Sequence, residues 1–194
     1  MTTITAPPVD STSVGDPAHF LTLAQLQRQL EELEPAPADA GRVAFVMRRG
    51  PNGIRETPGE IRLVLDIGVE GDAWGRKAQR DPQMQIAVMQ PDVAALIANG
   101  QPVTLFGDAL FLELDLSTAN LPAGSRVRVG PALLEVTPAP HNGCRKFQAR
   151  FGAEALRFVS SPQWRQRNLR GIYMRVVEPG VVRPGDPVAV LARP

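Results

Sequence analysis

The fold is decided by residues 121–144, which read Leu-Pro-Ala-Gly-Ser-Arg-Val-Arg-Val-Gly-Pro-Ala-Leu-Leu-Glu-Val-Thr-Pro-Ala-Pro-His-Asn-Gly-Cys. Two short runs rich in Val and Leu, 126–129 and 133–137, flank the turn Gly130-Pro131, an arrangement typical of antiparallel strands. The only cysteine of the chain follows closely on the second run. The stretch therefore predicts two paired strands that lead into a loop bearing one thiol.

Short strands and turns also dominate the rest of the chain. The 17 Gly and 19 Pro residues among 194 exceed the usual share of about 12% and fall between short β-branched runs. Further strands are expected at 42–47, 60–66, 85–89, 111–116, 172–178 and 188–191. The turn Pro51-Asn52-Gly53 predicts a hairpin between the first two of these, and the glycines of 68–75 predict an ordered loop. The pattern indicates an α+β, β-barrel-rich fold rather than alternating βαβ units.

Four segments have helical signals. Thr22 and Gln25 fit a capping box at the start of an amphipathic helix over 22–33, and Pro91 opens a helix that ends at Ala98. Residues 153–159 and 162–168 predict two more short helices. We expect a disordered N-terminal tail over 1–18, an N-terminal helix and linker over 19–41, and one main domain over 42–194.

Composition excludes several classes of protein. One cysteine cannot form an internal disulfide, and with two histidines it cannot build a zinc cage. No window reaches the roughly 18 apolar residues of a membrane span, and the N-terminus lacks the charges and apolar run of a signal peptide. We therefore expect a soluble, cytoplasmic protein with no membrane partner. The net charge of +1 argues against nucleic-acid binding.

The cations are concentrated in one part of the chain. Residues 141–175 hold eight Arg or Lys side chains against one acid, Glu154, and seven of the eight are Arg. The planar guanidinium group binds phosphate or carboxylate through two parallel hydrogen bonds. This segment therefore predicts a small-molecule or cofactor ligand with anionic groups, whereas a solvated basic helix face is the plainer alternative.

Cys144 lies within this basic segment. Arg145, Lys146 and His141 favour its thiolate, which is both the nucleophilic form and the form that binds soft metals. A buried cysteine acting as a small hydrophobe is the structural alternative, but burial beside so many charges would be costly. His141 is either a general acid or base or a residue that hydrogen-bonds within the loop.

The ordered motifs resemble the MOSC domain, a family named after the C-terminal domain of molybdenum cofactor sulfurases. The resemblance extends over about 42–192. It is carried by Gly-Val-Glu-Gly-Asp (68–72), the stretch 121–137, Pro-His-Asn-Gly-Cys (140–144), Leu-Arg-Gly (169–171) and Arg-Pro-Gly-Asp (183–186). It implies a β-barrel-rich fold with a cysteine that either binds molybdenum in a pterin cofactor or carries sulfur.

The resemblance also implies roles for individual residues. Cys144 matches the family cysteine, which makes it the metal ligand and a catalytic residue. Arg170 and Arg175 fall where the family has basic residues near anionic groups of the cofactor, and Glu70-Gly71-Asp72 matches a loop of the site. We add Arg145 and Lys146 as cofactor-binding residues and His141 or Asp72 as a proton source. Where reductase members tend to have a Gly-Glu-Asn-like turn, this chain has Gly107-Asp108-Ala109.

Three functions follow from these residues. The first is a molybdenum-pterin oxidoreductase that reduces N-hydroxylated substrates with electrons from a donor protein. The second is a sulfur transferase in which Cys144 receives a persulfide from a sulfur donor protein. The third is a non-catalytic module that binds an anion or phosphorylated metabolite. Pyridoxal phosphate, with Lys146 as the Schiff-base amine, belongs to this third group.

Overall fold

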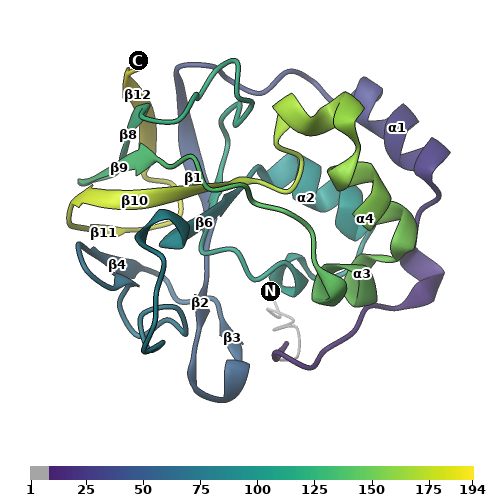
Figure 1. Ribbon diagram of the computed structural model, residues 1–194, viewed down its shortest axis with the longest axis horizontal. Coiled ribbons are helices and arrows are strands. Elements are labelled where there is room, and N and C mark those ends of the chain that lie inside the picture. Colours follow the sequence, from purple (N-terminus) through teal and green to yellow (C-terminus); the bar gives the residue numbers. More distant parts are fainter. Residues whose placement is uncertain (1–8) are drawn as a thin grey trace, which may run out of the picture.

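The computed structural model describes residues 9–194, which form a closed seven-stranded barrel with helices against one side (Figure 1). Around the barrel the strands follow the order β1 (Ala40–Val46), β12 (Pro187–Ala192), β8 (Arg126–Val129), β9 (Ala132–Val136), β10 (Ile172–Glu178), β6 (Ile86–Met89) and β7 (Leu110–Leu112). All neighbours are antiparallel except β6 and β7, which are parallel. The expected β-barrel-rich α+β fold is confirmed.

Two smaller sheets lie outside the barrel. One has the order β11 (Gly180–Val182), β4 (Ile61–Val64), β5 (Gly68–Val69), and the other pairs β2 (Arg48–Arg49) with β3 (Arg55–Glu56). The expected hairpin between 42–47 and 60–66 is wrong, because β1 pairs with β12 and β7. The turn around Pro51 instead joins β2 to β3, whose two residues each are too few to show a periodicity.

The helices α1 (Leu23–Glu32), α2 (Pro91–Ala98), α3 (Arg145–Phe151) and α4 (Ala153–Ser160) gather on the side of the barrel drawn to the right in Figure 1. The capping box of Thr22 and Gln25 is present at the start of α1. The segment expected as a fourth helix is the 3-10 helix Pro162–Arg167. Gly152, with a φ of +90°, breaks the chain between α3 and α4.

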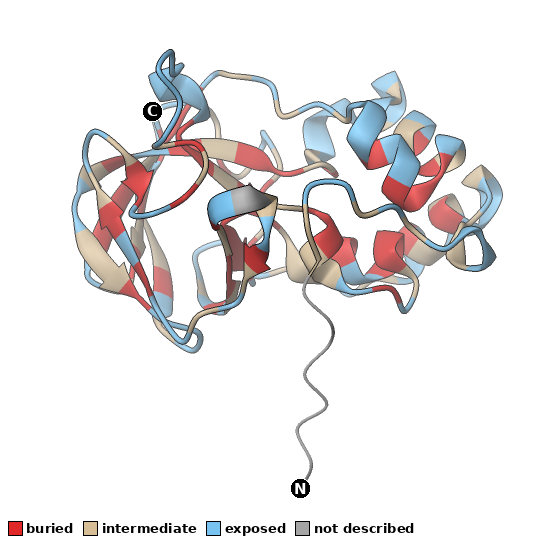
Figure 2. Cartoon of the chain, turned by 90° about the horizontal axis from the view of Figure 1, so that it is seen from below, coloured by how far each residue is buried: buried red, intermediate tan, exposed pale blue. Residues whose placement is uncertain are grey.

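Two apolar cores explain this arrangement. One fills the barrel, and the other lies between the barrel wall and the helices, whose inner faces are buried (Figure 2). Leu110 and Leu112 point into the barrel core, whereas Phe111 between them packs against the helical core. The strand β7 is therefore buried on both faces, which hides the alternation that a half-exposed strand would show.

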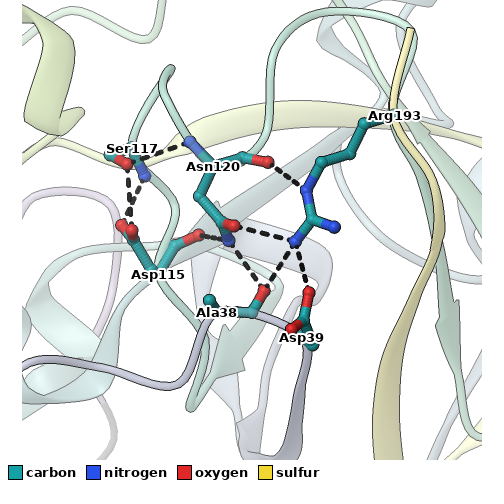
Figure 3. A network of polar contacts seen from close by, with 6 residues as sticks. All are labelled: Ala38, Asp39, Asp115, Ser117, Asn120 and Arg193. Carbon is teal, nitrogen blue, oxygen red and sulfur yellow. Dashed lines mark hydrogen bonds and ion pairs between the residues drawn. The ribbon is translucent and has the colours of Figure 1, made fainter.

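A polar network ties the two ends of the main domain together (Figure 3). It joins the segment before β1, the loop after β7 and the end of β12 through Ala38, Asp39, Asp115, Ser117, Asn120 and Arg193. The strand expected to run to Leu116 ends at Leu112. Asp115 therefore lies in the loop after β7, where its carboxylate accepts hydrogen bonds from Ser117 at 2.9 and 3.0 Å.

The N-terminal segment packs against the domain where the structure describes it. Residues 1–8 of the expected disordered tail lie outside the described residues, but residues 9–18 pack against the domain. The carbonyl of Val9 accepts a hydrogen bond from the Arg55 amide at 2.7 Å, and the Gly15 amide donates to Ala149 at 3.0 Å. These contacts are made by the main chain, so the polar composition of the segment does not reveal them. None of the helices among residues 9–194 is long and apolar enough to cross a membrane.

Candidate functional site

A cavity of about 620 Å³ opens between the end of the barrel and the helical side of the molecule. Four of the residues expected at a functional site line it: His141, Cys144, Lys146 and Arg170. They come from the loop after β9, from α3 and from the segment before β10. The structure therefore brings the cysteine and part of the basic segment to one cavity.

The cavity is strongly cationic. Seven cationic side chains and two carboxylates line it, where the carboxylates are Asp81 and Asp108. The cations are Arg49, Arg55, Lys77, Arg80, Lys146, Arg150 and Arg170. Such an excess of one sign in a concave site attracts an anionic ligand.

Cys144 is exposed and immediately precedes α3 as its N-cap residue. Its thiol makes no hydrogen bond to any described residue, and its carbonyl accepts from Gln148. The residue before it, Gly143, lies close to α4, because a Cβ on Gly143 would lie 2.4 Å from Leu156 of that helix. Its lack of a side chain is explained by this packing and not by a ligand close to the main chain. The thiol is thus free to react or to bind.

Asp108 is fully buried and holds the wall of the cavity. It accepts two hydrogen bonds from Nη1 of Arg170, at 3.0 and 2.9 Å, and His141 Nε2 lies 3.5 Å from its Oδ1. The Arg170 guanidinium is also placed over the rings of Phe106 and Phe147, at 5.8 and 5.4 Å. Nε of Arg170 is buried and has no partner among the described residues.

His141 is a neutral side chain in this wall. Burial, together with the charge of Arg170, lowers its pKa to about 3. Because Nε2 faces a carboxylate, it carries the proton of the neutral ring, and Nδ1 is buried without a partner among the described residues. The ring stacks on Tyr173 at 4.2 Å between centroids. His141 is therefore a poor proton donor at neutral pH.

This environment makes the stability of the protein depend on pH. The unfolded chain binds a proton at His141 below about pH 6.5, whereas the folded state does so only near pH 3. The free energy of unfolding therefore falls as the pH is lowered through this range. The contribution of His141 should lower the free energy of unfolding of the wild-type protein by about 2 kcal/mol between pH 7 and pH 5. Urea unfolding of wild type, His141→Gln and the control His19→Gln tests this. Parallel pH curves for wild type and His141→Gln would contradict it.

Asp72 lies behind the cavity rather than in it. Its carboxylate accepts hydrogen bonds from the amide, Nε and Nη2 of Arg49, at 2.7, 3.0 and 2.6 Å, and from the Trp74 amide at 2.8 Å. Although burial opposes the carboxylate, Arg49 lowers the pKa of Asp72 overall. Asp72 is therefore ionised and occupied, so it orients Arg49 and is no proton source. Trp74 is a buried wall of the cavity.

Arg55 is a buried cation of the cavity, with 7% of its surface exposed. Its Nη1 donates to the carbonyl of Asp10 at 3.2 Å, and its Nε is buried without a partner among the described residues. Burial and the nearby charges of Arg150 and Arg49 lower its pKa to about 10. No carboxylate of the described residues forms an ion pair with it.

Besides Asp72, four residues expected at the site are not part of the cavity lining. Arg175 lies on the outer barrel wall, where Nε and Nη2 donate to Glu135 of β9 at 3.1 and 2.7 Å. Glu70 is exposed and lies 3.8 Å from Arg62, and the carbonyl of Gly71 accepts from Arg76. Arg145 is exposed and is not one of the lining residues.

Several residues of the cavity were not predicted from the sequence. Arg49, Arg55 and Tyr173 were not singled out, and Asp108 was noted only as a departure from a family turn. Arg49 and Arg55 belong to a charged hairpin far from Cys144 in the sequence, so only the fold brings them near. Asp108 did carry a signal, because a single acid stands there between apolar residues.

The comparisons with known proteins agree with this geometry. The family model described as MOSC domain matches residues 81–189, more than half of the chain. The chain belongs to the MOSC domain family. Within this MOSC domain, the matched segment includes Asp108, Cys144 and Arg170, whereas Arg49 and Arg55 precede it.

Solved structures show the same fold. The YuaD protein from Bacillus subtilis aligns with a TM-score of 0.60 and 18% identity, over 80% of this chain and 97% of that one. YiiM from Geobacillus stearothermophilus aligns at 0.55 and 17%, over 79% and 76% of the two chains. YiiM from Escherichia coli aligns at 0.52 and 21%, over 79% and 71%. No curated protein sequence matches this MOSC chain significantly.

Proposed function

We propose that the cavity binds a molybdenum-pterin cofactor, with the Cys144 thiolate as the protein ligand of the metal and the arginines as partners of its anionic groups. The observation that supports this most directly is the exposed thiol of Cys144 in one cavity with seven cationic side chains. A thiolate is a soft metal ligand, and guanidinium groups bind phosphate. Membership of the MOSC domain family agrees with this choice of cofactor.

The residues fit such a group in three respects. The cavity volume of about 620 Å³ is in the usual range for sites that bind small molecules. Among residues 9–194, no three His, Cys, Asp or Glu side chains come together to hold a metal by themselves. One cysteine therefore suits a metal that is already coordinated by its organic cofactor. The Nε atoms of Arg55 and Arg170, which have no partner among the described residues, provide donors for anionic groups.

The bound cofactor would supply a metal centre able to exchange two electrons with a substrate. Arg170, fixed by Asp108, and Arg49, fixed by Asp72, orient anionic groups without needing to reorganise. Burial raises the pKa of Tyr173, so its hydroxyl stays protonated at neutral pH and is the proton donor that lines the cavity. His141 and Asp72, considered for this role from the sequence, are held neutral and ionised, respectively.

We assign the reaction to the reduction of N-hydroxylated substrates. The N–O bond breaks, the oxygen leaves as water, and the step consumes two electrons and two protons. The electrons would come from a donor protein, which makes an electron-transfer protein the expected partner. We propose neither a nucleic acid nor a membrane as a partner.

The proposal is tested by analysis of the wild-type protein purified from a molybdenum-replete host. We expect molybdenum and the oxidised pterin at close to one equivalent each per chain, because the cavity is preformed and its ligand is accessible. Elemental analysis and pterin fluorescence measure the two. Protein that never carries molybdenum in such a host would overturn the proposal.

A specific observation also supports one alternative function. The accessible, unpartnered thiol of Cys144 also suits a persulfide carrier, which needs no metal. A metal-free protein whose intact mass gains one sulfur after treatment with a sulfur donor would favour it.

Pyridoxal phosphate on Lys146, which lines the cavity, would instead give a Schiff base that borohydride reduction fixes.

A further inference from the structure

Two buried arginines at one end of the cavity have no acidic partner among residues 9–194. Arg55 is bound only through Nη1, to the carbonyl of Asp10. Arg150, with 6% of its surface exposed, donates Nε to Ser13, Nη1 to Leu105 and Nη2 to Ser11, at 3.3, 3.1 and 3.3 Å. All of these acceptors are main-chain carbonyls, which satisfy hydrogen bonds but do not neutralise charge.

Two partly buried arginines of the cavity differ in this respect. Arg49 is paired with Asp72 and Arg170 with Asp108. The less buried pair therefore has carboxylate partners, whereas Arg55 and Arg150 have none among the described residues. An isolated buried charge is costly unless a counter-ion accompanies it. The depressed pKa of both Arg55 and Arg150 reflects this cost.

The N-terminal segment closes this end of the cavity. Ser11 lines it, and the carbonyls of Asp10, Ser11 and Ser13 are the acceptors that hold the two guanidinium groups. Arg55 Nε remains without a partner among the described residues, although the side chain is more than nine-tenths buried and lines the cavity. The segment thus positions the cations but leaves a donor free.

We infer that the end of the cavity formed by Arg55, Arg150 and the N-terminal segment 9–13 is a binding site for a doubly charged phosphate group. Two uncompensated cations match the charge of a phosphate monoester dianion, and its oxygens accept the free guanidinium donors. The inference deepens the proposed function, because this end would hold the phosphate of the cofactor, with Cys144 at the metal. It applies to a phosphorylated ligand of any other kind as well.

The inference is tested with inorganic phosphate on the full chain, expressed in a host that cannot make the pterin so that the cavity is free. Thermal unfolding is compared in phosphate and in chloride at equal ionic strength. At ten times Kd, phosphate should raise the Tm of wild type by about 3–6 °C. In NMR spectra it should also shift the amide signals of Ser11 and Thr12.

Two variants make the test specific. Arg55→Met keeps the length of the side chain but removes its charge, so it should be at least as stable as wild type in chloride and should gain less than about 1 °C from phosphate. Arg175→Met removes the same charge from the outer barrel wall, and phosphate should raise its Tm as much as that of the wild-type protein. A full phosphate response in Arg55→Met, or none in wild type, would overturn the inference.

Failure here can be told apart from failure of the proposed function. Wild type that holds molybdenum and pterin, but whose free form does not respond to phosphate, overturns only the phosphate site. A normal phosphate response in a protein that never acquires molybdenum overturns only the assignment of the cofactor.

Discussion

The Cys144→Ser variant, purified from a molybdenum-replete host, should contain less than about a tenth of the molybdenum found in the wild-type protein. A serine hydroxyl stays protonated near pH 7 and is a hard ligand, so it does not replace a thiolate at a soft metal site. Cys144 is exposed and its thiol makes no hydrogen bond to a described residue, so the substitution should leave the Tm almost unchanged. Elemental analysis of purified protein measures the loss.

The neighbouring Arg145 provides the matched control. It is exposed and does not line the cavity, so Arg145→Gln should retain the molybdenum of wild type. Equal losses in the two variants would show that the segment, not the thiol, matters. Full molybdenum content in Cys144→Ser would contradict the assignment of Cys144 as the ligand.

Asp108→Ala should lower the free energy of unfolding by about 3–5 kcal/mol, the usual cost of breaking a buried ion pair from one side. The substitution leaves Arg170 without the carboxylate that accepts its two Nη1 hydrogen bonds, and it removes the carboxylate that lies 3.5 Å from His141 Nε2. Chemical unfolding at pH 7 measures the change.

The control and the rescue for this prediction come from the same chain. Asp39 forms an exposed ion pair with Arg193, so Asp39→Ala should cost less than about 1 kcal/mol. Adding Arg170→Met to Asp108→Ala removes the stranded cation and should recover part of the stability. A cost for Asp108→Ala no larger than that for Asp39→Ala would refute the role of Asp108 in holding the wall.

The strands that alternate or carry clear turns could be predicted from the sequence. The predicted strand 126–129 coincides with β8, and the turn at Gly130 connects it to β9 as expected. The pairing of β1 could not be predicted, because its partners β7 and β12 lie far away in the sequence and a local turn gave a plausible alternative. Local patterns fix elements better than they fix long-range pairing.

The candidate site was predicted where it is continuous in the sequence. Cys144, His141 and Lys146 reach the cavity together because one short segment carries them. Arg175 does not, although it shares a strand with Tyr173, because the strand has by then moved away from the cavity along the barrel wall. A strand advances about 3.3 Å per residue, so two positions suffice to leave a site.

Residues that support the site were the hardest to predict. Asp72 was expected to contact the ligand, but the fold turns its carboxylate towards Arg49. The roles of Asp108 and of the N-terminal segment depend on burial and on main-chain carbonyls, which composition does not reveal. These roles arise only when separate parts of the chain come together in the folded protein.

A metal cofactor bound by Cys144 in the cation-rich cavity would be visible in a crystal structure of the protein from a molybdenum-replete host, with diffraction data collected on both sides of the molybdenum absorption edge. We expect one anomalous peak at bonding distance from Cys144 Sγ, with density for a phosphate beside Arg55. A molybdenum peak elsewhere in the molecule, or a fully loaded protein with an unbound Cys144, would contradict it.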